Sequence, residues 1–228
     1  MPESVEVEFW HRQLLLAEVT SSQQGTELRL LPTPGGFMGL ARRISYGLSA
    51  FVLAFMVLPG PPANAWVLNG CKYAGTNPAI GYRYYSLSSI WQSAFNSGQN
   101  EWDATSAPGY FTYTPSDDTP NIKVQDYWSS STWWGLAQGG CDSGGGQVWY
   151  NELVTITFNN RTADSLSATE KFLVATHELG HAYGLAHSSL GCGTNRPVMR
   201  SDPTWVYDNC GDPWAPYPND VNGVNAVY

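Results

Sequence analysis

Three of the chain's four histidines fall in one eleven-residue segment, HELGHAYGLAH, at residues 177–187. His177 and His181 are four residues apart, so on an α-helix their imidazoles leave the same face about one turn apart. Gly184 follows, and glycine readily adopts the left-handed backbone that ends a helix and reverses the chain. A fold that contains this segment therefore has a helix end here, with His187 placed to return toward the other two histidines.

The spacing of these histidines is that of ligands to a tetrahedral Zn²⁺ ion. Two imidazoles from one helix and a third from the following loop leave one position open to water. Glu178 adjoins the first histidine and can meet a bound water without ligating the metal. A single histidine is usually a surface or core residue. Here, however, the predicted helix, the glycine that ends it and the third histidine all occur together in one segment. We therefore expect His177, His181 and His187 to bind one catalytic zinc ion.

The helix that carries this segment has a clear start. Ser167 and Glu170 form a Ser-x-x-Glu capping box, in which each side chain accepts a hydrogen bond from the other residue's backbone N–H. Apolar residues recur through residues 171–183, and Gly184 is placed to stop the helix. The sequence therefore predicts a helix that carries two of the three histidines in its last two turns.

The rest of residues 66–228 alternates between helical and extended patterns. Residues 88–101 have an apolar stripe of helical period and predict a helix. Alternating residues predict strands at 110–114 and 122–127, paired across a turn, and a further strand region at 147–158. Residues 128–146, rich in Ser, Thr, Trp and Gly, are expected to form a loop.

The histidine segment has the pattern HExxHxxGxxH, which resembles the zinc signature of the metzincin metallopeptidases. Ser188, directly after the third histidine, resembles the matrixin branch, the matrix-metalloproteinase-like catalytic domains. Metzincins also carry a methionine in a tight turn beneath the zinc, and Met199, 12 residues after His187, matches it. Position 201 is Ser, whereas astacin-like and serralysin-like members have Tyr there, so the matrixin-like assignment is favoured. The predicted elements, which end in a helix near residues 220–228, follow the matrixin order.

The resemblance implies an α+β, metzincin-like fold with a mixed twisted β-sheet, a zinc-binding active-site helix and a smaller C-terminal subdomain. It also implies a zinc-dependent endopeptidase that hydrolyses peptide or protein substrates, with Glu178 as general base. Substrate would lie antiparallel along an exposed strand edge, which we place within residues 147–158. The substrate pocket would be shaped by the segment that follows Met199, namely by Ser201, Asp202, Pro203 and Thr204. Neither a cysteine-switch propeptide nor histidines for a second, structural zinc are found in the sequence.

Two other functions stay open. A carbohydrate- or peptide-binding module would use exposed tryptophans such as Trp133 and Trp134 beside a structural zinc. Glu178 and the lack of a fourth ligand favour a catalytic site instead. A zinc esterase or small-molecule amidase would share the metal and differ in substrate. Three aromatic residues after Met199 are expected in the core: Trp205, Tyr207 and Trp214.

Residues 44–58 form an uncharged apolar run that follows Arg42 and Arg43. The run is shorter than the roughly 20 residues that a membrane-spanning helix needs. An Ala-x-Ala cleavage site comes next and ends at Ala65. These features predict a secretory signal peptide and a secreted, extracellular protein.

Signal peptides stand at the start of a chain, and Met38 precedes this one closely. We assign residues 1–37 to an upstream over-extension of the reading frame, with a long amino-terminal region of the signal as the alternative. Residues 38–65 are then the signal peptide, and residues 66–228 are the metallopeptidase domain. We expect that domain to be a monomer without stable membrane insertion.

Residues 66–228 hold 7 Lys and Arg against 14 Asp and Glu, a net charge of −7. This balance argues against binding nucleic acid or anionic lipid. All four cysteines lie in this part, and in an exported domain they predict two disulfides. Of the three pairings we favour Cys71–Cys141 and Cys192–Cys210, because the second closes a short loop that is worth about 3 kcal/mol.

Two features outside the histidine segment carry chemistry of their own. Asp142 stands among glycines in residues 139–146 and could supply oxygen ligands, so Ca²⁺ is kept as a second ion to consider. Asn160-Arg161-Thr162 fits the acceptor sequence for N-glycosylation.

Overall fold

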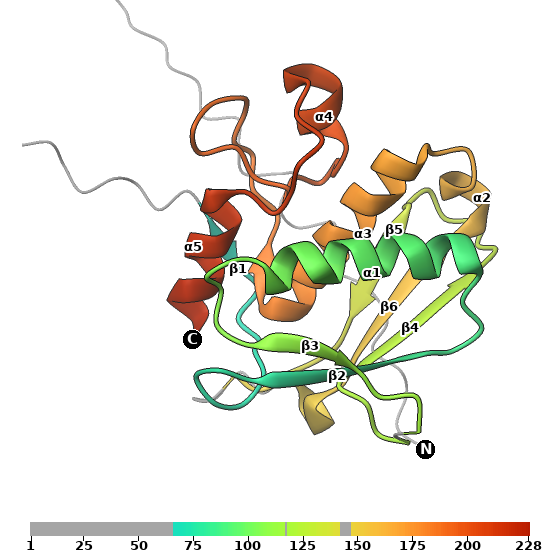
Figure 1. Cartoon of the computed structure of the whole chain (residues 1–228), viewed down its shortest axis with the longest axis vertical. Helices are drawn as coiled ribbons and strands as arrows, with labels where there is room; N and C mark the ends of the chain where they lie inside the picture. The colour runs from blue at the N-terminus through green and yellow to red at the C-terminus, as the bar shows by residue number, and fades with distance from the viewer. Residues whose placement is uncertain (1–65, 117, 142–146) are drawn as a thin grey trace, which may run out of the picture. The chain divides into compact units, whose positions relative to one another are not determined.

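A five-stranded mixed sheet lies at the centre of the fold (Figure 1). The computed structural model describes residues 66–116, 118–141 and 147–228, which all belong to one compact unit of the chain. The strands lie in the order β3-β2-β4-β6-β5. Their bounds are β2 Ala79–Tyr84, β3 Tyr110–Tyr113, β4 Ile122–Tyr127, β5 Gly135–Gln138 and β6 Val154–Asn159. The first four strands in this order pair in parallel, whereas β5 runs antiparallel to β6.

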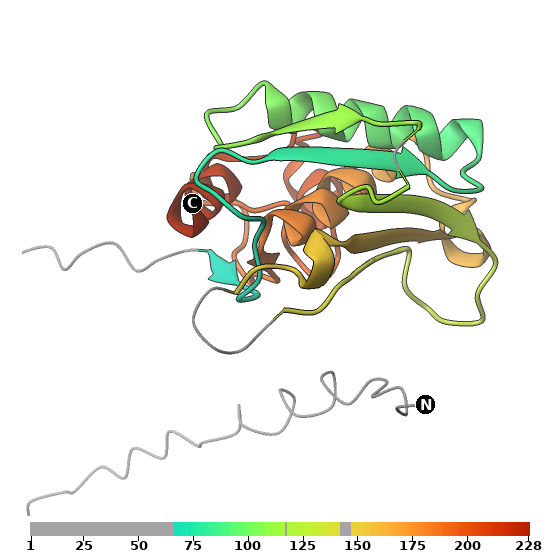
Figure 2. The same cartoon turned by 90° about the horizontal axis from the view of Figure 1, so that it is seen from below.

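Two long helices, α1 and α3, pack against this sheet, and a small second sheet lies beside it. The helices are α1 Ser89–Asp103, the 3₁₀ turn Tyr150–Glu152, α2 Asn160–Ala163, α3 Ala168–Tyr183, α4 Trp205–Cys210 and α5 Pro218–Val227. The second sheet pairs β1 (Val67–Leu68) with β7 (Leu185–Ala186) antiparallel. Figures 1 and 2 both place α5 near β1, at the end of the molecule where the chain terminates. Within the described residues, no helix is long and apolar enough to cross a membrane.

Helices α1 and α3 pack against each other and against the sheet, and this packing fixes where α3 lies. The indole of Trp91 stacks on Phe158 with ring centroids 4.0 Å apart, and both residues are fully buried. Gly98 lets the two helices approach closely, since a Cβ there would lie 2.8 Å from the hydroxyl of Thr176. The Trp102 indole N–H donates to the Thr176 carbonyl at 2.9 Å and ties α1 to the middle of α3.

Helix α3 has the ends that its sequence predicts. The Ser167 and Glu170 side chains each accept a hydrogen bond from the other residue's backbone N–H, so the capping box is present. Gly184 ends the helix in the left-handed region with φ 109°. A Cβ at Gly184 would collide with the Cys71 carbonyl oxygen, so glycine is required there for space as well as for backbone conformation. The prediction of a capped, glycine-terminated helix is confirmed.

The sheet corrects three predictions. Strands at 110–113 and 122–127 exist, but they are not partners, because β2 lies between them and pairs with both. The loop expected at 128–146 contains β5, and of the region 147–158 only residues from Val154 onward belong to a strand. Strand order is set by contacts between distant segments, which local alternation does not report.

Two disulfides link segments outside the main sheet. Cys71 pairs with Cys141 and Cys192 with Cys210, which is the pairing favoured from loop length. The first joins the start of the described chain to the segment after β5, and the second joins the loop after His187 to α4. The predicted signal peptide and the residue Asp142 lie outside the described residues.

Candidate metal centre and active site

Three imidazoles meet at the carboxyl end of α3. The Nε2 atom of His187 lies 3.2 Å from the Nε2 atoms of both His177 and His181. His177 and His181 come from successive turns of α3, and His187 comes from the segment that follows β7. Among the described residues, these three are the one group of three or more ligating side chains placed to hold a metal ion.

The outer nitrogens of two imidazoles are held by backbone carbonyls. His177 Nδ1 lies 2.9 Å from the Val198 oxygen, and His181 Nδ1 lies 2.7 Å from the Leu185 oxygen. A carbonyl only accepts, so both Nδ1 atoms carry the proton and both Nε2 atoms present a lone pair. This arrangement is the one in which protein histidines bind a metal through Nε2.

Burial keeps the imidazoles neutral. Burial lowers the pKa of His177 well below its usual range, and the neighbouring His181 and His187 lower it further. Burial lowers the pKa of His181 to about 4, with a smaller effect from His187, and it also lowers the pKa of His187. At neutral pH, unprotonated nitrogens therefore lie 3.2 Å apart, and a cation between them would relieve the repulsion of their lone pairs. The donor set, three neutral imidazoles, fits Zn²⁺.

The segment that brings His187 back to α3 is held on both sides. Before it, β7 pairs with β1, and the Asn69 side chain donates to the His181 carbonyl at 2.9 Å. After it, the backbone N–H of Ser188 donates to the carbonyl of Met199 at 2.6 Å. The third imidazole is therefore positioned by backbone contacts on each side of it.

Met199 packs against α3, the helix that carries two of the histidines. Its side chain is 2% exposed and packs on Gly180, where a Cβ would collide with the Met199 sulfur. Gly180 stands on α3 between His177 and His181 in the sequence, so the Met199 sulfur contacts the helix between these two histidines. The residue before it, Val198, supplies the carbonyl that holds His177.

Asp220 on α5 holds the segment that contains Val198 and Met199, and this role was not identified from the sequence. One carboxylate oxygen accepts hydrogen bonds from the backbone N–H groups of Val198 and Tyr217, each at 2.9 Å. Asp220 is 1% exposed, and burial raises its pKa to about 7 despite the backbone N–H groups that lower it. A polar residue in the first turn of a predicted helix is usually a cap, so no signal in the sequence pointed to this contact.

Glu178 is buried beside the histidines, at the contact between α3 and β5. Burial raises the pKa of Glu178 to about 8, and a hydrogen bond from the Ala137 backbone lowers it in part. The other carboxylate oxygen, Oε2, is buried without a hydrogen-bond partner. Gly135 faces this side chain, since a Cβ at Gly135 would lie 2.6 Å from Glu178 Oε1. Gly135 and Ala137 of β5 thus line one side of the Glu178 carboxylate.

The strand at the edge of the sheet beside Glu178 is β5. The prediction that this edge lies within residues 147–158 is therefore wrong. Residues 154–158 belong to β6, which lies between β4 and β5 and has both edges paired. The remainder of the range 147–158 includes the 3₁₀ turn before β6. The edge was misplaced because the four residues of β5, Gly-Leu-Ala-Gln, carry no alternating pattern.

The segment after Met199 is only partly exposed. Ser201 is exposed and Asp202 half-buried, whereas Pro203 and Thr204 are buried. The Asp202 carboxylate accepts from the Thr204 backbone N–H at 3.2 Å, so the segment forms a tight local turn.

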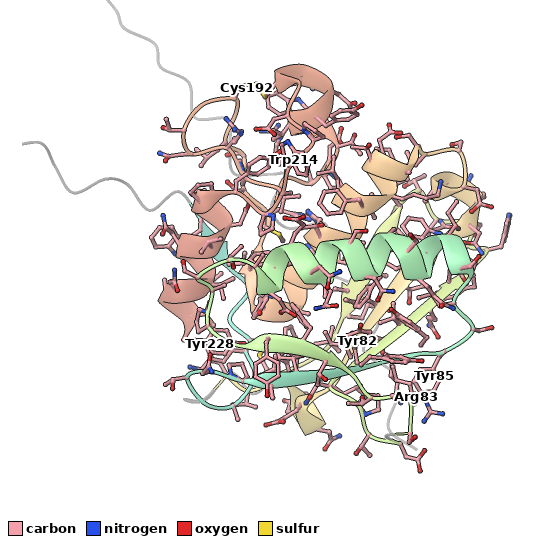
Figure 3. All side chains as sticks on the ribbon, in the orientation of Figure 1. Tyr82, Arg83, Tyr85, Cys192, Trp214 and Tyr228 are labelled. Atoms are coloured by element: carbon pink, nitrogen blue, oxygen red, sulfur yellow. A yellow bond between two sulfur atoms is a disulfide. The ribbon has the colours of Figure 1, made fainter. Side chains whose placement is uncertain are left out.

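The aromatic residues near the site divide into two groups. Trp205 and Tyr207 are half-buried against the core, but Trp214 is 69% exposed, so the prediction that it belongs to the core is wrong. Figure 3 marks Trp214 and Cys192, which both lie in the C-terminal segment around α4. Trp133 and Trp134 are half-buried rather than displayed together on the surface.

Comparison with known proteins finds a loose structural likeness. No protein-family model matches the chain, and no curated protein matches it. Two solved structures of myroilysin are similar to it, at 21% identity with TM-score 0.38 and at 22% identity with TM-score 0.36. The first similarity covers 53% of this chain and 54% of the myroilysin chain, about half of its length, and the second covers 74% of each. Both TM-scores are below 0.5, so function is inferred from the side chains of the site.

Proposed function

We propose that this protein is a secreted zinc-dependent endopeptidase of the matrixin-like metzincin type. The observation that carries the proposal is the meeting of three Nε2 atoms from His177, His181 and His187 beside the buried carboxylate of Glu178. The packing of Met199 on Gly180 of α3 and the α+β arrangement of the chain support the metzincin assignment.

The residues of the site have separate tasks in peptide hydrolysis. His177, His181 and His187 would hold Zn²⁺, which would supply Lewis acidity toward the scissile carbonyl and toward water. Glu178 accepts the proton that the attacking water loses and returns it to the leaving amine. The Ala137 backbone N–H donates to Glu178 and favours the ionised carboxylate, which is the form that accepts the proton.

Peptide substrate pairs with the outer edge of β5. An extended peptide antiparallel to β5 adds a sixth strand to the sheet, with its scissile bond beside the carboxylate that faces Gly135 and Ala137. Ser201 and Asp202, the more exposed residues after Met199, contribute to the pocket that receives a substrate side chain. Pro203 and Thr204 are buried and support Ser201 and Asp202 from the interior of the protein.

The proposal assigns residues 66–228 to the catalytic domain and residues 38–65 to a secretory signal peptide. Two disulfides fit a protein that matures in an oxidising compartment.

Cleavage assays with the secreted protein test the function. The account predicts hydrolysis of casein or of a peptide library, loss of hydrolysis with a zinc chelator, and recovery when Zn²⁺ is restored. Glu178→Ala is expected to keep its zinc and to lose cleavage by several orders of magnitude, since its buried carboxylate is the proton carrier. Hydrolysis of esters without hydrolysis of peptides would reject the peptide substrate, and a fully active Glu178→Ala would reject the role of Glu178.

A further inference from the structure

The loop that joins β4 to β5, residues 128–134, is fastened to α2 by one arginine. Figure 1 shows this loop passing beside α2. The Arg161 guanidinium donates through Nε to the carbonyl of Ser129 at 2.9 Å. Through Nη2 it donates to the carbonyls of Ser130 at 2.9 Å and Ser131 at 2.6 Å. One side chain thus binds three successive carbonyls of the loop.

Two neighbours of Arg161 fasten the same loop. Asn159 is fully buried, and its amide nitrogen donates to the carbonyls of Ser131 at 2.9 Å and Trp133 at 3.1 Å. Its side-chain oxygen accepts from the backbone N–H of Ser129 at 3.0 Å. The Thr162 hydroxyl also donates to the Trp133 carbonyl. We name Asn159, Arg161 and Thr162 the clamp.

These hydrogen bonds join residues that are far apart in the sequence. They satisfy backbone groups of the loop, which lies outside the helices and strands. The clamp residues stand 26 to 32 positions beyond the loop residues that they bind. A loop outside a sheet has no ladder partner for its carbonyls, so side-chain donors hold it in one conformation.

The clamped loop leads directly into β5, which lines one side of the Glu178 carboxylate. The backbone N–H of Asn159 donates to the Trp134 carbonyl at 2.9 Å, which is the last bond before β5 begins at Gly135. Gly135 faces Glu178 Oε1, and Ala137 donates a backbone hydrogen bond to the same side chain. A displacement of the loop would therefore be passed to β5.

Strand β5 is short and lies at the edge of the sheet. It has four residues and pairs only with β6 among the described strands. A short outer strand that must also accept a peptide gains from being ordered beforehand, because the peptide then does not have to order it.

We propose that the clamp is a set of positioning residues that fixes β5 as the strand on which substrate pairs. The proposal rests on the proposed peptidase function, which gives β5 its substrate. The clamp also gives a role to two residues of the sequon Asn160-Arg161-Thr162. In the folded chain the Thr162 hydroxyl and the Arg161 guanidinium are used to hold the loop, and the side-chain oxygen of Asn160 is buried.

The test compares Arg161→Ala and Thr162→Val with the unaltered protein. Arg83→Ala is the matched control, because Arg83 is an arginine at the end of β2, next to Tyr85 (Figure 3), and pairs with Asp118 on the surface. Amide hydrogen exchange is measured for peptides that cover residues 128–138. The KM for an octapeptide substrate and inhibition by acetohydroxamic acid, a small metal-binding probe, are measured on the same samples.

The account predicts faster exchange across residues 128–138 in both clamp variants. The octapeptide KM is expected to rise about tenfold in Arg161→Ala and by a smaller factor in Thr162→Val, which loses one hydrogen bond. Inhibition by acetohydroxamic acid should stay within about twofold of the unaltered protein, because the probe does not pair with β5. Arg83→Ala should match the unaltered protein in all three measurements.

Unchanged exchange and unchanged KM in Arg161→Ala would overturn the proposal. An equal loss of octapeptide binding and of acetohydroxamic acid binding would also overturn it, because the variant would then have damaged the whole site. Should Arg161→Ala fail to fold, Thr162→Val decides alone, since it keeps the size of the side chain. If the unaltered protein cleaves no peptide, the proposed function fails, and hydrogen exchange by itself decides whether the clamp holds β5.

Discussion

Replacement of Gly135 by Ala tests whether β5 sets the position of Glu178. The new Cβ would lie 2.6 Å from Glu178 Oε1, 2.8 Å from Glu178 Cγ and 2.9 Å from Val174 Cγ1. Ordinary contacts begin at 3.4 Å, so the carboxylate or the strand must move by 3.4 − 2.6 = 0.8 Å. A misplacement of about 1 Å can cost about 100-fold in rate, or about 2.7 kcal/mol of transition-state stabilisation.

We expect Gly135→Ala to lower kcat/KM for a peptide substrate by about 100-fold while zinc content stays at one ion. Zinc should remain because the proposed ligands His177 and His181 are held by the carbonyls of Val198 and Leu185, away from β5. Overpacking should also lower the free energy of unfolding by about 1–3 kcal/mol. The measurements are steady-state kinetics, metal analysis and denaturant unfolding.

Gly191→Ala is the control for the Gly135 variant. A Cβ at Gly191 would lie 3.7 Å from Trp205, which is an ordinary contact, so activity and stability should stay near those of the unaltered protein. Wild-type kinetics in Gly135→Ala would refute the claim that the strand and the carboxylate are in contact. Loss of zinc together with activity would refute the claim that the substitution leaves the three histidines in place.

Three further predictions concern the metal, the core and pH. His181→Ala removes one of the three proposed ligands, so we expect zinc to be lost on dialysis, and stoichiometric zinc in that variant would contradict the ligand set. Phe158→Ala leaves a void against Trp91 and should cost about 3–5 kcal/mol of unfolding free energy by denaturant titration; a cost below about 1 kcal/mol would contradict the stacked core. The raised pKa of Asp220, about 7 in the folded protein, means that the folded state keeps a proton that the unfolded state releases. Unfolding free energy relative to Asp220→Asn should therefore fall as pH rises from about 4 to about 7, and a difference that is constant with pH would reject buried titration of Asp220.

The elements that the sequence predicts well are those with local signals. Helix α3 has a capping pair, an apolar stripe and Gly184, all within one stretch of chain, and each acts through neighbours three or four residues away. The spacing of His177, His181 and His187 is likewise local, and the structure brings their Nε2 atoms together.

The elements that the sequence does not predict depend on distant contacts. Strand β5 is a strand because β6 pairs with it, and its residues Gly135 and Ala137 have low intrinsic preference for strands. The hydrogen bond from Val198 to Asp220 and the clamp around Asn159 join segments more than 20 residues apart. Strand β2 is a different case, because Ile80, Tyr82 and Tyr84 alternate in the sequence and gave a signal that could have been used.

The most direct test of the central claim is X-ray absorption at the zinc edge of the purified protein. The account predicts one zinc per chain, bound by three histidine nitrogens at about 2.0–2.1 Å and one oxygen at a similar distance. Sulfur in the coordination sphere, a fourth protein ligand in place of the oxygen, or a protein that holds no zinc would contradict it.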